Sequence, residues 1–155
     1  MSEIDQLLDD LRVVYNKMAW LNGDKMKKAL EGYTASEVHW LEFIENTPDV
    51  NVTKLSEHFF MTRGAMSKAT KKLIAKGAIY SGKKADNKKE IYFELTEEGR
   101  RVYNLHETLH QEFKIRDKHI FDTLSKETIS EVDTFLKKYN QHLTSEIKKN
   151  DLKIQ

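Results

Sequence analysis

Apolar residues recur at steps of three and four along most of this 155-residue chain, which is helical spacing. A first helix is predicted over about residues 3–28, and a last apolar stripe of the same period runs from Ile129 to Ile147. One segment differs, because Ile91, Phe93 and Leu95 alternate with polar neighbours, as in a strand. The sequence therefore predicts a mainly α fold with one small β-hairpin, an α+β class.

Local signals divide the first half of the chain into four helices. Thr34 and Glu37 form a capping-box pattern ahead of a second helix, which ends before Pro48. Thr53 is the predicted N-cap of a short third helix, and Thr62 the predicted N-cap of a fourth. Two helices joined by so tight a turn, the second rich in lysine, are typical of a helix-turn-helix.

A hairpin and two long helices follow. The fourth helix is predicted to turn four apolar side chains inward, namely Met66, Ala69, Leu73 and Ile74. Residues 79–81 are a candidate strand that would pair with the alternating segment across a polar loop at residues 82–89. Such a hairpin with a basic tip is the wing of a winged helix. Thr96 and Ser125 are predicted to cap the fifth and sixth helices.

Charge is distributed unevenly along the chain. Residues 53–89 contain ten Lys and Arg side chains but only two acids, a net charge of +8. Since the whole chain carries +1, the remainder carries −7. A basic middle between acidic ends indicates a polyanion-binding centre inside a helical frame.

Composition excludes several classes of protein. The chain has no cysteine, which removes disulfides, thiol redox sensing and every cysteine-based zinc site. No apolar run is long enough to cross a membrane, and the acidic N-terminal segment lacks the charge pattern of a secretory signal. We therefore expect a cytoplasmic protein.

The order of elements resembles the MarR family of dimeric bacterial transcriptional regulators. The residues that carry the resemblance are 52–57 (VTKLSE), 62–68 (TRGAMSK), 73–79 (LIAKGAI) and 95–99 (LTEEG). The resemblance implies a single domain over residues 1–155, with a winged-helix lobe at about 34–96 and dimerisation helices at about 1–33 and 97–155. The wing departs from the family pattern at two positions, because its usual Asp-x-Arg is replaced by Asn87 and Lys89. Lysine lacks the bidentate fork of arginine.

This resemblance also implies how DNA is bound. The fourth helix would enter the major groove, where Arg63 can offer two donors to a guanine edge. A homodimer would bind a pseudo-palindromic operator in double-stranded DNA, with half-sites about 34–36 Å apart, and would act as a repressor. The predicted DNA contacts are Thr53, Lys54, Arg63, Gly64, Ser67, Lys68, Lys71, Lys72, Lys83, Lys84, Lys88 and Lys89.

Residues 106–110 spell His-Glu-Thr-Leu-His, the H-E-x-x-H pattern of zinc metallopeptidases. An enzyme is therefore a remote alternative from a different class. The motif stands alone, on a helix expected to help build the dimer region, so we expect no catalysis. Metal binding without catalysis is a better hypothesis, since His106 and His110 are neighbours on a helix.

A zinc-sensing branch of the MarR family carries two histidines with this spacing and a third that corresponds to His39. In that branch the fourth ligand is a carboxylate near the end of the first helix, and Asp24 is its nearest counterpart here. Three imidazoles and a carboxylate suit Zn(II). The plain alternative is that these are ordinary helix histidines.

A second kind of effector stays open within the same family. Many members are released from DNA by a small phenolic or carboxylate compound bound between the scaffold and the DNA-binding lobe. Tyr15, Trp20, Tyr33 and Trp40 are candidates to line such a pocket, although aromatic residues at helical spacing are more often core. The sequence therefore predicts a DNA-binding regulator whose effector is either a metal ion or an organic ligand.

Overall fold

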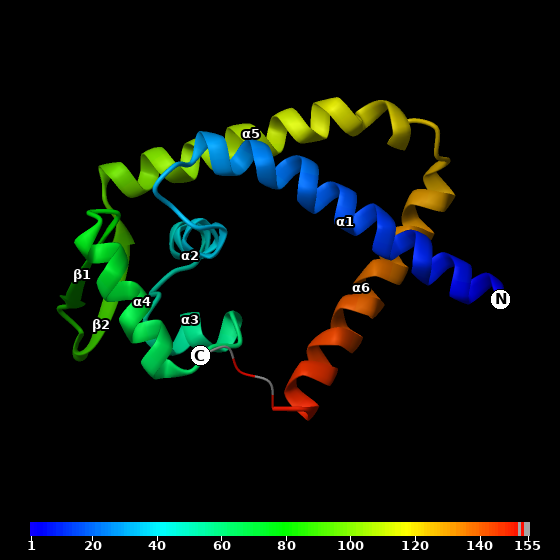
Figure 1. The fold of residues 1–155 in the computed structure, drawn as a ribbon. Coiled ribbons are helices and arrows are strands. Elements are labelled where there is room, and N and C mark those ends of the chain that lie inside the picture. Colours follow the sequence, from blue (N-terminus) through cyan, green and yellow to red (C-terminus); the bar gives the residue numbers. More distant parts are fainter. Residues whose placement is uncertain (152, 154–155) are drawn as a thin grey trace.

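The computed structural model describes residues 1–151 and 153 (Figure 1). Its elements follow the predicted order of four helices, a hairpin and two further helices. They are α1 (Glu3–Ala29), α2 (Ala35–Asn46), α3 (Val52–His58), α4 (Arg63–Ala75), β1 (Ile79–Lys84), β2 (Asn87–Leu95), α5 (Glu97–Phe121) and α6 (Lys126–Lys149). The predicted class, mainly helical with one antiparallel hairpin, is confirmed. Of the predicted range 97–155, residues 152, 154 and 155 lie outside the described residues.

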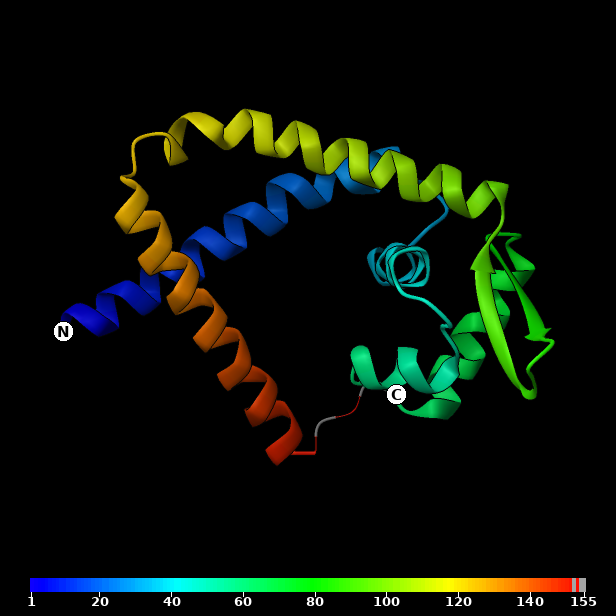
Figure 2. The same cartoon turned by 180° about the vertical axis from the view of Figure 1, so that it is seen from behind.

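The C-terminal part of α1 lies against α5, whereas its N-terminal half diverges from α5 (Figures 1 and 2). Lys25 Nζ on α1 lies 2.7 Å from Glu112 Oε2 on α5, which joins the two helices directly. The helix α6 leaves the end of α5 that is farthest from the hairpin. Neither α1 nor α6 has a buried residue, so their apolar stripes are exposed within the described chain.

The hydrophobic core lies where α2, α3, α4, the hairpin and the start of α5 meet. Leu55, Met66 and Leu73 are fully buried there, as the helical spacing predicted for the last two. Ala69 is half-buried. The prediction for Ile74 was wrong, because its side chain is 39% exposed. Its helical position, one residue beyond Leu73, turns it about 100° away from the core.

The predicted N-caps are confirmed with one exception. Thr62, Thr96 and Ser125 each accept a hydrogen bond from the backbone three residues on, and Thr34 forms the predicted capping box. Thr53, however, is not the cap of α3. Asn51 takes that place, because its Oδ1 accepts from the N–H of residue 54 at 2.9 Å. The helix therefore begins one residue before Thr53.

The wing is longer and its loop shorter than predicted. The strands continue to Lys84 and resume at Asn87, so only two residues connect them. Asn87 holds this turn, since its Oδ1 accepts from the backbone N–H groups of Lys89 and Glu90 at 3.1 and 3.2 Å. Polar side chains do not prevent strand pairing at the tip of the hairpin, which is open to solvent. At its base, Ile79, Phe93 and Leu95 are buried in the core.

The start of α5 is fixed tightly to the lobe. The N–H of Thr96 donates to the carbonyl of Ala78 at 3.0 Å. A Cβ atom at Gly99 would lie only 2.0 Å from the same carbonyl oxygen, so the helix and the turn approach as closely as glycine allows. This contact sets where α5 leaves the lobe. None of the helices in the described chain is long and apolar enough to cross a membrane.

Candidate DNA-binding surface and histidine cavity

The helix α4 presents a basic outer face. Its N-cap Thr62 ends the turn after α3, and Phe60 in that turn has a φ of +54°. The inner face packs on the core, while the predicted contacts Arg63, Gly64, Lys68, Lys71 and Lys72 are exposed and Ser67 is half-buried. Most of them line one shallow groove along the helix.

The helix α3 and the wing flank this face, and Figures 1 and 2 place all three elements at the same end of the molecule. Arg63 Nη2 donates to Thr53 Oγ1, so the two predicted contacts from α3 and α4 lie against each other. On the wing, Lys83, Lys88 and Lys89 are exposed and form no ion pair within the described residues. These lysines leave the wing positively charged.

Several positive charges of the basic segment are partly bound within the protein. Lys54 Nζ donates to the Pro48 carbonyl at 3.0 Å. Lys84 pairs with Asp49 and its ammonium lies 5.0 Å from the centre of the Tyr92 ring. These two predicted DNA contacts therefore offer less free charge than the other lysines.

Lys76, at the end of α4, is used entirely inside the fold. Its Nζ lies 2.9 Å from Glu37 Oε1 and 2.6 Å from the Gly32 carbonyl oxygen, and 5.0 Å from the centre of the Tyr33 ring. Burial raises the pKa of Glu37, but hydrogen bonds from Lys76 and Thr34 outweigh this and hold that pKa below its ordinary value. Lys76 thus ties the end of α4 to the start of α2.

The predicted histidines meet in a cavity of about 420 Å³ between α1, α2 and α5. His39 comes from α2, and His106 and His110 come from α5. The cavity is lined by Tyr15, Ala19, Asn22, Gly23, Met26, Lys27, Leu30, Tyr33, Ala35, Val38, His39, His106, His110 and Phe113. Histidines 71 positions apart in the chain are brought to one site only by the packing of α2 on α5.

The imidazoles face one another closely. His106 Nε2 lies 3.0 Å from His110 Nε2, and the ring centres of His39 and His106 are 5.9 Å apart. His106 is only 3% exposed. Burial, followed by the neighbouring His110, lowers its pKa, so this side chain is held as the neutral imidazole. The neutral form is the one that ligates metal ions.

Asp24 is not brought to these histidines. Its carboxylate lies 3.0 Å from Lys28 Nζ and is well exposed, and it is not among the residues that line the cavity. Asn22, two residues before Asp24 on α1, does line the cavity. Its buried Oδ1 has no hydrogen-bond partner in the described chain. Sequence reasoning missed Asn22 because it sought a charged ligand.

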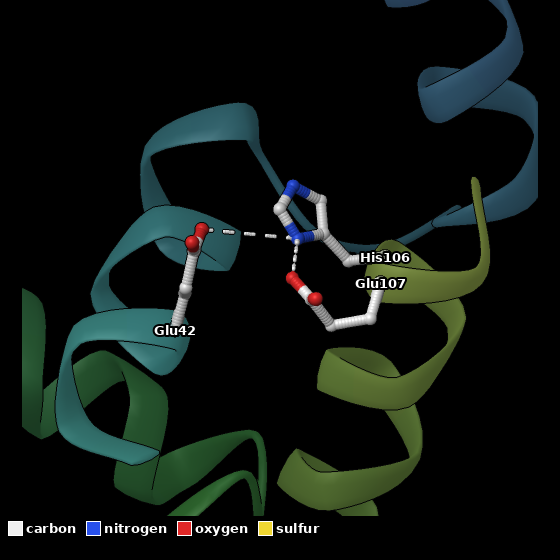
Figure 3. Close-up of side chains that lie close together, drawn as sticks. All are labelled: Glu42, His106 and Glu107. Atoms are coloured by element: carbon white, nitrogen blue, oxygen red, sulfur yellow. Dashed lines mark ion pairs between the residues drawn. The ribbon is translucent and has the colours of Figure 1, made fainter. Parts of the chain in front are cut away.

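The other ring nitrogen of His106 faces two carboxylates. Nδ1 lies 3.9 Å from Glu42 Oε2 on α2 and 3.9 Å from Glu107 Oε1 on α5 (Figure 3). This nitrogen is buried and has no hydrogen-bond partner in the described residues. Glu42 was missed, although it stands three positions after His39 and so shares its side of α2.

The predicted aromatic pocket is only half right. Tyr15 and Tyr33 line the histidine cavity, but Trp20 and Trp40 do not. Trp20 is 80% exposed, and Trp40 packs against the core of the lobe. Sequence periodicity could not separate these cases, since all four lie on or beside helices. His58 stacks on Phe43 with ring centres 4.4 Å apart and lies outside the cavity.

The helix-turn-helix of α3 and α4, followed by a basic wing of β1 and β2, defines a winged-helix DNA-binding protein. A family model described as MarR family matches residues 33–91. An uncharacterized HTH-type transcriptional regulator of Bacillus subtilis (strain 168), YvnA, is 33% identical over 112 residues, which cover 72% of this chain and 69% of YvnA. The chain belongs to the MarR family of winged-helix transcriptional regulators, as the resemblance predicted.

Two further comparisons agree. A second uncharacterized HTH-type regulator of the same organism, YhjH, is 33% identical over 96 residues, and the matched part spans 62% of this chain and about half, 55%, of YhjH. The crystal structure of Streptococcus pneumoniae FabT in complex with DNA has the same fold, with a TM-score of 0.79 at 22% identity over 92% of this chain and 99% of FabT. Regulators of this family are in general not enzymes, which weighs against the metallopeptidase alternative.

Proposed function

We propose that the protein is a homodimeric transcriptional repressor that binds a pseudo-palindromic operator in double-stranded DNA. The observation that carries the proposal is the exposed basic face of α4, flanked by the free lysines of the wing. Arg63 would contact a base edge in the major groove, whereas Lys68, Lys71 and Lys72 would contact phosphates. Asn87 is occupied with the turn of the wing, so Lys89 would add phosphate attraction and not a fixed minor-groove contact.

The exposed apolar stripes support a dimer. Monomeric proteins in water rarely expose large contiguous apolar surfaces, and such surfaces mark interaction sites. Large apolar side chains are exposed on α1, α5 and α6, among them Ile4, Leu7, Leu8, Val14, Met18, Leu21, Ile115, Ile120, Phe121, Ile129, Val132, Phe135, Leu136 and Leu143. A second copy packed on these helices would bury them and would place two α4 helices about one DNA turn apart.

Within this function, Zn(II) is the effector that the histidine cavity favours. Three imidazoles from two helices converge there, and an imidazole-rich set suits zinc. Asn22 Oδ1 or a water molecule would complete the set, since Asp24 is paired with Lys28. The donor chemistry of these residues therefore suits the ion. The fourth ligand differs from the predicted one, and His39 would move toward the close pair His106 and His110 when zinc binds.

Zinc would act as a cross-link between the lobe and the scaffold. His39 lies on α2, which belongs to the lobe that carries α4, and His106 and His110 lie on α5, which leads into the scaffold. Joining these helices would favour one angle between the recognition helix and the dimer, and so one DNA-binding state. By its resemblance to the zinc-sensing branch, we expect the metal-bound protein to be the form that binds DNA.

An organic effector is the second candidate, because the same cavity has suitable size and lining. Its volume of about 420 Å³ falls within the range of small-molecule sites. Tyr15, Met26, Leu30 and Tyr33 supply apolar walls, and Lys27 supplies a cation for a carboxylate. Such a ligand would change the same helix angle in the opposite sense and release DNA.

Fluorescence anisotropy of a labelled operator, selected from random double-stranded DNA, tests these proposals. The dissociation constant is measured in chelator, after addition of zinc, and after addition of zinc to the His106→Ala variant. We expect zinc to tighten binding by about 5- to 150-fold, the usual range of allosteric coupling. His119→Ala is the matched control, because His119 is an exposed histidine on the same helix outside the cavity.

The outcomes separate the alternatives. A zinc effect that is lost in His106→Ala and kept in His119→Ala supports the zinc-dependent repressor. Equal binding with chelator and with zinc would leave the organic effector ahead. Hydrolysis of unfolded casein by the zinc-loaded protein, absent in His106→Ala, would overturn both in favour of a peptidase.

A further inference from the structure

His106 has two ring nitrogens in two different environments. Its Nε2 faces His110 Nε2 at 3.0 Å inside the histidine cavity. Its Nδ1 points the other way, toward Glu42 Oε2 and Glu107 Oε1 at 3.9 Å each (Figure 3). The side chain of His106 is only 4% exposed, and the buried Nδ1 has no hydrogen-bond partner in the described chain. A buried polar atom of this kind calls for a ligand.

The two carboxylates form a cluster with this nitrogen. One ligand atom from each of Glu42, His106 and Glu107 lies within 4.8 Å of the others. The carboxylate side chains are each 40% exposed, so the cluster opens to solvent on one side and ends at the imidazole on the other. Within the described residues, neither glutamate pairs with a lysine or arginine.

We propose that Glu42, His106 Nδ1 and Glu107 form a second divalent-cation site, separate from the cavity of the three histidines. Two carboxylate oxygens and one imidazole nitrogen form a harder ligand set than three imidazoles, so this site would accept an ion such as Mn(II) with water in its open positions. Its net negative charge compensates the divalent cation. The unpartnered Nδ1 distinguishes this cluster from an ordinary pair of surface glutamates.

The two sites share His106, and this makes them mutually exclusive. A neutral imidazole carries one proton and has one ring nitrogen free to bind a cation. When Nδ1 binds a cation, the proton stays on Nε2, where His110 Nε2 at 3.0 Å can accept it. When Nε2 binds zinc, the proton is on Nδ1 and faces the two carboxylates. The mutual exclusion of the two sites rests on the zinc site of the proposed function. The carboxylate site itself does not depend on that zinc site.

This arrangement gives the protein a means to compare two metals. A cation at the carboxylate site withdraws His106 from the three-histidine set, so it would weaken zinc binding by reciprocal coupling. Both sites join α2 to α5, because Glu42 lies beside His39 on α2. They differ in the ring nitrogen of His106 that forms the cross-link, which is Nε2 in the histidine cavity and Nδ1 in the carboxylate site.

Titration of the full-length protein with Mn(II), after treatment with chelator and its removal, tests the site directly. Electron paramagnetic resonance measures the free Mn(II) that remains in solution. We expect one Mn(II) bound per chain in the unmodified protein and in His39→Ala, and none in the Glu42→Gln/Glu107→Gln variant. Glu131→Gln, on α6 and exposed, is the control for loss of a surface carboxylate.

Zinc competition then tests the exclusion. Adding Zn(II) to the Mn(II)-loaded protein is expected to release the bound Mn(II) at a lower zinc concentration than in His39→Ala/His110→Ala. That variant has lost its zinc cavity, so Zn(II) can release Mn(II) from it only by direct competition at the carboxylate site. Absence of Mn(II) binding, or binding unchanged in the double glutamine variant, would overturn the second site. Binding of both ions together would overturn the exclusion. If the histidine cavity does not bind zinc, zinc affinity will be the same in the unmodified protein and in His39→Ala. The Mn(II) titration does not depend on that result.

Discussion

Replacement of Lys76 by methionine is expected to destabilise the protein through a buried charge. The Glu37 side chain is only 4% exposed, and Lys76 Nζ is its ionic partner at 2.9 Å. Methionine keeps the apolar length of the lysine side chain but removes the ammonium. Glu37 is then left with the N–H of Thr34, at 3.0 Å, as its hydrogen-bond donor in the described chain.

The magnitude follows from this geometry. Breaking one side of a buried ion pair costs about 3–5 kcal/mol. Because the Lys76 side chain is 27% exposed and the Thr34 N–H stays in place, we expect the lower end, about 3 kcal/mol. For a chain of this size that corresponds to a fall in Tm of roughly 6–12 °C. The second variant Glu37→Gln/Lys76→Met keeps the cap and removes the charge, so it is expected to recover most of the loss.

Thermal and urea unfolding measure both variants. The protein concentration is kept fixed, since the proposed dimer would make stability depend on concentration. Burial raises the pKa of Glu37 in the folded protein. Hydrogen bonds from Lys76 and Thr34 outweigh this effect and hold the pKa below its ordinary value of 4.5. Its ionised form therefore adds stability above the unfolded pKa, and this is lost as pH falls through the folded pKa. The gap between unmodified protein and Lys76→Met is thus expected at pH 7 and should shrink below pH 4.5.

Two results would refute this reasoning. One is a Lys76→Met variant within about 0.5 kcal/mol of the unmodified protein, the range of ordinary surface substitutions. The other is a double variant no more stable than Lys76→Met, because then the buried charge is not the cause of the loss.

Three further predictions follow from the fold and the proposed function. Lys71→Ala is expected to lower the slope of log affinity against log salt by about 2 per proposed dimer, about one unit for each lost phosphate contact. Lys137→Ala on α6 is the control, and an unchanged slope in Lys71→Ala would place Lys71 away from DNA. Gly99→Ala is expected to cost about 1–3 kcal/mol of unfolding free energy, because its Cβ would lie 2.0 Å from the Ala78 oxygen; thermal unfolding without a fall in Tm contradicts that contact. Leu136→Glu, at a side chain 48% exposed, is expected to shift the dimer to monomer in light scattering, and Lys137→Glu is not; a Leu136→Glu dimer of unchanged affinity would exclude α6 from the interface.

Local patterns in the chain were sufficient for the elements and for much of the site. Helix periodicity, four N-caps and one alternating segment predicted the order of elements, because each depends on residues within a few positions of one another. The basic face of α4 and the pair His106 and His110 belong to the same class, since a helix alone places residues four apart together.

Contacts between helices were beyond such patterns. The wrong expectations concern the burial of Ile74, the cap of α3 and the placement of Trp20 and Trp40 in the pocket. Each of these depends on which other residues pack around or bond to that position in the folded chain. Lys76 counted as one more positive charge in the basic segment, yet it is bound to Glu37 across 39 positions.

The sequence by itself determined a helical frame, a helix-turn-helix, a basic wing and a family, because these depend on spacing and residue type. Only the tertiary structure decided that Asn22 lines the histidine cavity while Asp24 does not, and that Glu42 reaches the far side of His106. The physical reason is that the side of α1 or α2 that faces α5 depends on how the helices cross. A rotation of about 100° per residue is enough to exchange a ligand for a solvated side chain.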